Sequence, residues 1–261
     1  QIAKCVCPAL PPVSFAMRYA DPLRARASRA GRSVPPFFGF TMPYAAAVFD
    51  LDGTLADTLD DLANACNRAI AAFGVPAIER DRYRYLVGQG VDYLVEHALA
   101  TGGADKQQHA REAAQLHIDG YRQHMYDHSG PYPGVPEMLD ALTAAGVKLA
   151  VLSNKPQRAT AEMVGHMFKR WRFDAVWGYR EPYAPKPDPA SARALIDHLG
   201  LTPAQTVYAG DTKVDMLTGK AAGFFTVGVT WGFRDEAELR DHGADRIVHH
   251  PAQLAAVVTG V

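Results

Sequence analysis

The 261-residue chain has few cysteines and no long apolar run. Its three cysteines, at positions 5, 7 and 66, are too few for a disulfide framework, and no pair of them has zinc-site spacing. This scarcity predicts a reducing, cytoplasmic setting. No stretch reaches the roughly 18 consecutive apolar residues that a membrane-spanning helix requires, so no membrane span is expected.

Neither sign of charge is in excess, because 27 lysines and arginines stand against 28 aspartates and glutamates, for a net charge of −1. This balance gives no electrostatic reason to expect nucleic acid or an anionic membrane as the main partner. Hydrophobic residues make up 48% of the chain and charged residues 21%, which is the composition of a globular protein with a sizeable core.

Residues 1–41 differ in composition from the rest of the chain. They hold six basic side chains, one acidic side chain and six prolines, with no apolar period of helix or strand type. We therefore expect an irregular basic extension here. Three interpretations stay open: an upstream extension before a natural start at Met42, an arginine-rich targeting peptide, or an ordered arm.

Short apolar runs without polar alternation recur along the rest of the chain. Such runs are typical of parallel strands that are covered on both faces. The helical patterns between them predict an α/β protein with a doubly wound, Rossmann-like parallel sheet. The predicted strands are residues 45–49, 147–152, 175–177, 206–209, 224–229 and 246–248, and the helices between them include 134–145, 190–199 and 214–222.

One segment, residues 58–130, interrupts the alternation of strands and helices. It contains no convincing strand, and Thr58 and Asp61 have the spacing of a capping box before a first helix. Glycine-containing breaks divide the predicted helices, which are 59–73, 82–87, 91–100 and 104–126. We expect a core domain built from residues 42–57 and 131–261, with a helical cap inserted at 58–130 and a hinge at 130–134.

Two carboxylates follow the first predicted strand, in the segment Asp50-Leu51-Asp52-Gly53-Thr54. The period of a strand places Asp50 and Asp52 on the same side of the chain, where they repel each other. This arrangement indicates either a Mg²⁺ ion between them or one carboxyl that keeps its proton as a general acid. Gly53 permits a tight turn. A calcium loop is a weaker interpretation, because no glutamate occupies its twelfth position.

Three further polar clusters lie at or after predicted strands. Ser153 and Asn154 follow one strand, Lys186 stands between prolines, and Asp211 and Asp215 are four residues apart after another strand. Each has an ordinary structural explanation: a helix cap, a surface loop lysine, and a second helix cap. Together they lie where open α/β sheets bind ligands, at the carboxyl ends of parallel strands.

The order and spacing of these clusters closely resemble the haloacid dehalogenase-like phosphohydrolases. The motifs that carry the resemblance are D-L-D-G-T at 50–54, S-N at 153–154, Lys186, and G-D-x-x-x-D at 210–215. The inserted helices resemble the first cap type of that superfamily. The resemblance extends from Pro43 to the end of the sequence.

The resemblance implies a role for each acid. Asp50 would be the nucleophile that forms an aspartyl-phosphate, and Asp52 would be the general acid and base. Mg²⁺ would be held by the Asp50 carboxylate, the Asp52 backbone carbonyl and Asp211, with Asp215 in the outer shell. The presence of both Asp50 and Asp52 favours phosphoryl transfer over dehalogenation.

The resemblance also implies which groups bind the phosphate. Thr54, Ser153 and the backbone N–H of Asn154 would bind phosphoryl oxygens, and Lys186 would stabilise the charge that develops on them. The helical cap would exclude water and recognise the leaving group.

Within the superfamily the sequence is most similar to bacterial phosphoglycolate phosphatases, which implies a small phosphorylated metabolite as the substrate. Arg84 and Gln89 in the cap are the candidates for contacting it, unless they are solvated loop residues. Sugar phosphates, amino-sugar phosphates, pyrophosphate and β-phosphoglucomutase-like phosphotransfer stay open, as does a Mg²⁺- and phosphate-binding scaffold without turnover. We expect a monomer or a homodimer. The similar segments are 49–58, 87–90, 132–135, 153–156 and 228–233.

Overall fold

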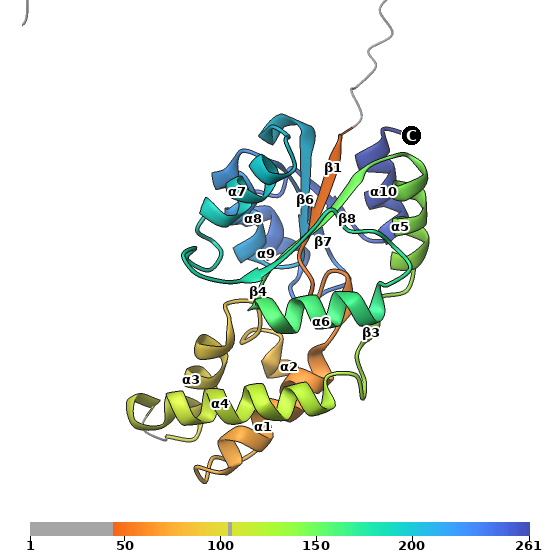
Figure 1. Cartoon of the computed structure of the whole chain (residues 1–261). Coiled ribbons are helices and arrows are strands. Elements are labelled where there is room, and N and C mark those ends of the chain that lie inside the picture. The colour runs from red at the N-terminus through yellow and green to blue at the C-terminus, as the bar shows by residue number, and fades with distance from the viewer. Residues whose placement is uncertain (1–43, 104–105) are drawn as a thin grey trace, which may run out of the picture. The chain divides into compact units, whose positions relative to one another are not determined.

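The computed structural model describes residues 44–103 and 106–261, and the structural statements below refer to these residues. The predicted extension at residues 1–41 lies outside them. The described chain forms a parallel sheet with helices on both faces, and a further group of helices is inserted after the first strand (Figure 1).

All of the strands predicted from the sequence belong to one sheet. They are Ala46–Phe49 (β1), Lys148–Pro156 (β4), Ala175–Tyr179 (β5), Thr206–Gly210 (β6), Phe225–Val229 (β7) and Arg246–Val248 (β8). The strands are parallel and follow the order β5-β4-β1-β6-β7-β8. The first strand therefore lies in the middle, between β4 and β6, and all three end at the same edge.

Helices cover both faces of the sheet, which confirms the doubly wound fold. They are Val135–Ala144 (α5), Gln157–Met167 (α6), Ala190–His198 (α7), Lys213–Ala222 (α8), Glu236–Asp241 (α9) and Pro251–Thr259 (α10), with a 3₁₀ turn at Pro203–Gln205 (η1). In Figure 1, α7, α8 and α9 lie on one side of the sheet, and α5 and α10 on the other. Phe49 packs in the larger hydrophobic cluster with α5 and α10, whereas Val48 packs in a second cluster with α7 and α8, which is why β1 is apolar throughout.

The inserted cap consists of Leu59–Ala71 (α1), Arg80–Tyr83 (α2), Val91–Thr101 (α3) and Lys106–His124 (α4). Helix α4 packs against both α1 and α3. The two connections between cap and core meet in a short antiparallel ladder, where Ala56–Asp57 (β2) pairs with Gly130–Pro131 (β3). The cap is therefore joined to the core at one place, and residues 130–131 of the predicted hinge lie in it.

Thr58 and Asp61 do not form the predicted capping box, so that prediction is wrong. Thr58 precedes α1 without a side-chain cap, and its hydroxyl donates to Asp52 Oδ1 at 2.8 Å instead. Asp61 is buried and accepts from the backbone N–H groups of His128 and Ser129. Thr58 thus bonds backward to an acid six residues earlier, and Asp61 has partners about 67 residues later in the chain, which a local pattern does not contain.

Two boundaries also differ from the prediction. The strand expected at 147–152 continues to Pro156, so Ser153 and Asn154 lie within β4 rather than after it. The register with β5 shifts between Leu152 and Pro156, and α6 then begins at Gln157. The helix expected at 82–87 is the shorter α2.

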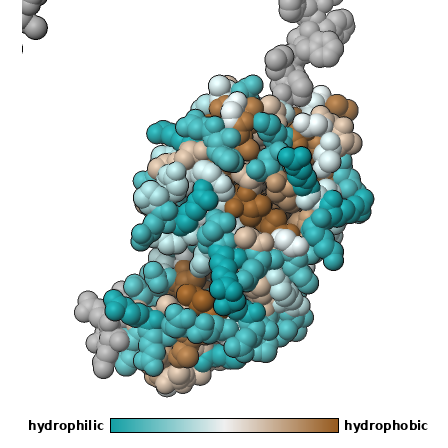
Figure 2. All heavy atoms as spheres, in the orientation of Figure 1, coloured by the Kyte–Doolittle hydropathy of each residue, from teal (hydrophilic) through white to brown (hydrophobic). Residues whose placement is uncertain are grey.

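Hydrophilic residues cover most of the face of the molecule in Figure 2, and a group of hydrophobic side chains is visible in the middle of the core domain. The helices of the described part of the chain include none that is both long enough and apolar enough to span a bilayer.

Candidate active site

Polar side chains gather at the edge where β1, β4 and β6 end. Asp50 directly follows β1, Asp211 directly follows β6, and Ser153 and Asn154 lie in the last residues of β4. All four side chains are buried. Because these strands are neighbours, their carboxyl ends bring together groups that are far apart in the sequence.

Three carboxylates form a compact group, since oxygen atoms of Asp50, Asp211 and Asp215 lie within 4.8 Å of one another and all three residues are buried. Burial raises the pKa of Asp50 to about 7, against the effect of Lys186. Burial and the neighbouring carboxylates also raise the pKa of Asp211 well above its usual value. Three buried carboxylates carry more negative charge than one neighbouring ammonium can balance, and a hard divalent cation with oxygen ligands supplies the remaining positive charge. The composition of the group therefore fits a divalent-cation site.

Lys186 places an ammonium group beside these acids. Its Nζ lies 3.1 Å from Asp50 Oδ1 and 2.7 Å from Asp215 Oδ1. It also donates to the Tyr208 hydroxyl at 2.9 Å and to the Leu152 carbonyl at 3.1 Å. Four contacts to groups from different elements hold the ammonium in place, next to the carboxylate that is expected to act as the nucleophile.

The Asp52 carboxylate is not a member of the compact acid group and has its own partners. Lys155 Nζ donates to its Oδ1 at 2.9 Å and to its Oδ2 at 3.0 Å, and the Thr58 hydroxyl donates to Oδ1 at 2.8 Å. Asp52 and Asp50 line the same pocket. The two acids thus have different surroundings, as separate roles for a nucleophile and a general acid require.

Asn154 connects three parts of the site. Its side-chain amide donates to the backbone carbonyls of Lys186 and of Gly88 in the cap, both at 3.0 Å, and its Oδ1 accepts from the Lys186 backbone N–H at 2.7 Å. The Ser153 hydroxyl oxygen accepts from the Lys155 backbone N–H at 3.2 Å. These bonds fix the end of β4 against the Lys186 loop.

Asp211 and Asp215 are held by their own hydrogen bonds. Asp211 Oδ1 accepts from the Thr54 hydroxyl at 2.9 Å, and its Oδ2 accepts from the Phe233 backbone N–H at 2.8 Å. Asp215 Oδ2 accepts from the N–H and the hydroxyl of Thr212, the residue that caps α8. The Thr54 hydroxyl, which is expected to bind phosphoryl oxygens, thus donates to an acid of the site.

A pocket of about 670 Å³, counted with the solvent at its mouth, opens from this edge of the sheet toward the cap. Asp50, Asp52 and the end of β4 form its core side, and residues of α3 and α4 form its cap side. The pocket is lined by Asp50, Asp52, Leu62, Val87, Gly88, Gly90, Val91, Leu94, His117, Ile118, Tyr121, Arg122, Ser153, Asn154, Lys155, Pro156 and Ala159.

The two cap residues suggested by the sequence lie outside this lining. Arg84 donates to the Gly232 carbonyl at 2.9 Å, so it connects the cap to the loop after β7. Gln89 is half-buried between Gly88 and Gly90. These two neighbours line the pocket, whereas Gln89 itself does not.

Sequence reasoning did not single out the pocket residues Lys155, Tyr121 and His117. Lys155 stands two residues after Ser153 in β4, and the period of a strand could have placed the two on the same side. Tyr121 and His117 are four apart on α4, which shows only that they share a helix face. Their position over the acids depends on how the cap packs on the core.

The comparisons with known proteins agree with this geometry. The family described as "Haloacid dehalogenase-like hydrolase" matches residues 47–229. A phosphoglycolate phosphatase of Pseudomonas putida is 37% identical over 194 residues, which cover 71% of this chain and 69% of that protein. A phosphoglycolate phosphatase of Caulobacter vibrioides is 36% identical, with coverage of 78% and 86%.

Solved structures show the same fold. The crystal structure of a predicted phosphoglycolate phosphatase from Haemophilus somnus superposes with a TM-score of 0.78 at 27% identity, covering 83% of this chain and 98% of that one. The chain therefore belongs to the haloacid dehalogenase-like hydrolases.

Proposed function

We propose that this protein is a Mg²⁺-dependent phosphomonoester hydrolase that converts 2-phosphoglycolate and water to glycolate and inorganic phosphate. The observation that carries the proposal is the position of Asp50. Its carboxylate is buried, contacts Lys186, belongs to the acid group and lines a pocket that Asp52 also lines.

Each residue then has a step in the reaction. An Asp50 oxygen attacks phosphorus while the bond from phosphorus to the ester oxygen breaks, and that oxygen takes a proton from Asp52. Water attacks the resulting aspartyl-phosphate and gives a proton to Asp52, so phosphate leaves and Asp50 is restored. Lys186 stabilises negative charge on the phosphoryl oxygens, as do Ser153 and the backbone N–H of Asn154.

We assign the acid group to Mg²⁺ because all of its side-chain donors are carboxylate oxygens. The carboxylates of Asp50 and Asp211 and the backbone carbonyl of Asp52 would hold the ion, with Asp215 in the outer shell. The bound ion neutralises charge on the phosphoryl group.

The names of the relatives support the assignment of the substrate. Proteins that are 37% and 36% identical to this chain are named phosphoglycolate phosphatases. Sugar phosphates, amino-sugar phosphates and pyrophosphate are the competing substrates, phosphotransfer is the competing reaction, and a scaffold without turnover is the non-enzymatic alternative.

The test is the release of phosphate from a panel of esters that includes 2-phosphoglycolate, p-nitrophenyl phosphate and the competing substrates. We expect Mg²⁺-dependent hydrolysis with the highest kcat/KM for 2-phosphoglycolate, and a loss of at least about 10³-fold in Asp50→Asn. Equal activity of Asp50→Asn would overturn the assignment of the nucleophile. A higher kcat/KM for another ester would overturn the assignment of 2-phosphoglycolate as the substrate, but it would agree with the proposed phosphatase reaction.

We also propose a cytoplasmic setting and a monomer or homodimer, as the sequence predicts. Cys66, the cysteine within the described residues, is buried and free. Light scattering on the purified chain measures the oligomeric state.

A further inference from the structure

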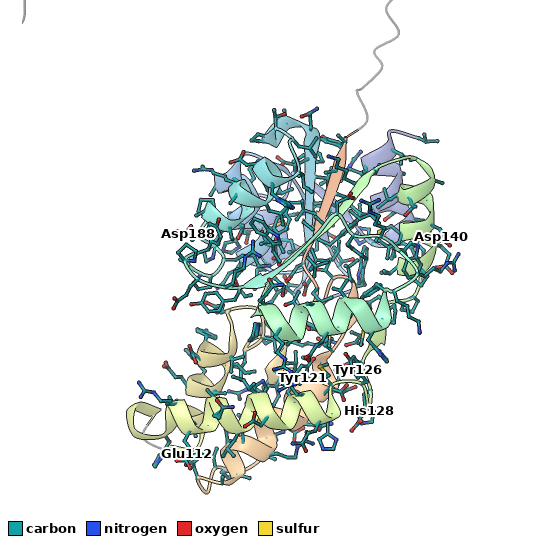
Figure 3. All side chains as sticks on the ribbon, viewed as in Figure 1. Glu112, Tyr121, Tyr126, His128, Asp140 and Asp188 are labelled. Atoms are coloured by element: carbon teal, nitrogen blue, oxygen red, sulfur yellow. The ribbon has the colours of Figure 1, made fainter. Side chains whose placement is uncertain are left out.

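The pocket contains a buried cation to which the proposed chemistry gives no role. Lys155 contacts Asp52 on the core side and donates to the Tyr121 hydroxyl of α4 at 3.0 Å. Its side chain is 4% exposed. Figure 3 shows Tyr121 on the side of α4 that faces α6, opposite Glu112. Lys155 therefore lies between the cap and the general acid.

The wall around Lys155 is mostly uncharged. Leu62, Val91, Leu94 and Ile118 line the pocket with apolar side chains. Burial lowers the pKa of His117 to about 3, and Lys155 adds to that effect, so the imidazole is neutral. Arg122 also lines the pocket, with 39% of its side chain exposed and Glu162 at 3.7 Å. A buried ammonium in such surroundings interacts strongly with an anionic group and repels other cations.

The Lys155 ammonium is charged and well oriented. The Asp52 carboxylate lies 2.9 Å from Nζ as its counter-charge, and the Tyr121 hydroxyl accepts a hydrogen bond from it at 3.0 Å. The Tyr121 ring also lies under the ammonium, 4.4 Å from Nζ to the ring centroid. A lysine held in this way acts as a fixed charge rather than as a nucleophile.

We propose that Lys155, held by Tyr121, is the specificity residue for the leaving group and binds the carboxylate of a two-carbon acid. The inference deepens the proposed function and rests on it, because that function places the ester oxygen at Asp52. Lys155 Nζ lies 2.9 Å from the Asp52 carboxylate, which places a positive charge beside the ester oxygen that Asp52 protonates. The carboxylate of a 2-phospho acid begins one carbon from that oxygen, which brings it within reach of the ammonium.

Charge balance supports the same assignment. When Asp52 carries the proton that the ester oxygen takes, it no longer neutralises Lys155. A carboxylate on the leaving group restores the ion pair at that stage, whereas an uncharged leaving group leaves the buried ammonium without a counter-charge.

The test compares two two-carbon phosphate esters, namely 2-phosphoglycolate, which carries a carboxylate, and 2-hydroxyethyl phosphate, which carries an uncharged hydroxymethyl group in its place. We expect wild type to prefer 2-phosphoglycolate in kcat/KM by about 10- to 100-fold, as for the loss of one charged hydrogen bond. In Lys155→Met the preference falls to within about threefold. Lys155→Arg keeps the charge and retains part of the preference. Lys169→Met, which removes an exposed lysine outside the pocket lining, leaves both rates unchanged.

Equal losses on both substrates in Lys155→Met would overturn the proposal, because Lys155 would then act only by positioning Asp52. A wild type that hydrolyses phosphate esters without any preference for a carboxylate would also overturn it, while leaving the phosphatase chemistry intact. A wild type without activity on any ester would instead refute the proposed function.

A second measurement needs only the wild-type chain, in case Lys155→Met does not fold. Lengthening the acid by one methylene, to 3-phosphonooxypropanoate, moves the carboxylate past the ammonium. We expect kcat/KM to fall by about tenfold relative to 2-phosphoglycolate. An equal or higher kcat/KM for the longer acid would contradict the proposal that Lys155 binds the carboxylate of a two-carbon acid.

Discussion

At the scale of single residues, Gly53, which directly follows Asp52, is required by geometry. Its φ of +87° lies in the left-handed region, and a Cβ at this position would overlap the Asp211 carboxylate. Asp211 has little room to move, because Thr54 and the Phe233 backbone N–H hold its two oxygens. Any larger residue must therefore displace an acid of the proposed metal site.

We expect Gly53→Ala to lower kcat/KM by at least about tenfold and to weaken Mg²⁺ binding, since it moves a ligand. Phosphate release measures kcat/KM, and the change in thermal unfolding when Mg²⁺ is added measures the binding of the ion. Gly74→Ala is the matched control, because Gly74 has a φ of +73° but open space around it. The control costs about 1 kcal/mol of stability through backbone strain alone and leaves activity unchanged. Equal activity in the two variants would contradict the expected displacement.

Site residues could be predicted from the sequence where they are contiguous or directly follow a strand with a clear apolar pattern. Asp50 and Asp211 could be placed together because each directly follows an apolar run, and the carboxyl ends of parallel strands share an edge. Lys155 could not be paired with Tyr121 in this way. Their contact depends on the docking of the cap, which no local pattern encodes.

At the scale of elements, Asp61 lies beside the connection between cap and core that the sequence predicts to be a hinge. This buried carboxylate on α1 accepts from the backbone N–H groups of His128 and Ser129 and from the Ser129 hydroxyl, at 2.6 to 3.1 Å. These donors immediately precede β3. Asp61 thus joins the first cap helix to the segment that returns to the core.

We expect Asp61→Ala to destabilise the protein by about 2–4 kcal/mol, because it leaves two backbone donors without their partner. Urea unfolding measures the change. Asp60→Ala on the same helix removes an exposed carboxylate that pairs with Arg80, and it costs at most about 1 kcal/mol. Comparable costs for the two variants would show that the hydrogen bonds of Asp61 contribute little.

Elements were predictable to different degrees for physical reasons. The strands of the buried sheet were all found, because apolar runs covered on both faces leave a strong pattern. The ladder of β2 and β3 was not predicted, since each strand has two residues and is defined only by its partner. The extension of β4 to Pro156 was missed because its last residues are the polar groups of the site.

At the scale of the whole molecule, a net charge of −1 conceals buried groups whose effects on stability have opposite pH dependence. Burial raises the pKa of Asp50 to about 7 from an ordinary 3.8, so the folded state binds more protons and unfolding becomes easier as pH rises between these values. Burial lowers the pKa of His117 to about 3 from 6.5, so the stability that the neutral imidazole contributes is complete above pH 6.5 and is lost as pH falls toward 3.

Because these two effects partly cancel in the metal-free protein, the response to Mg²⁺ reveals the acid group more clearly than the pH curve alone. A divalent cation binds the ionised carboxylates and relieves their repulsion, and this relief is largest where the acids have lost their protons. We expect Mg²⁺ to raise Tm by about 5 °C more at pH 8 than at pH 5, since each pH unit of proton competition corresponds to at most about 1.4 kcal/mol. Differential scanning fluorimetry with and without Mg²⁺ measures this, with NaCl of equal ionic strength as the control.

Asp211→Asn should remove most of the difference between the two pH values. An equal rise in Tm at both pH values, or an equal effect of NaCl, would mean that Asp50, Asp211 and Asp215 are not the site of the ion.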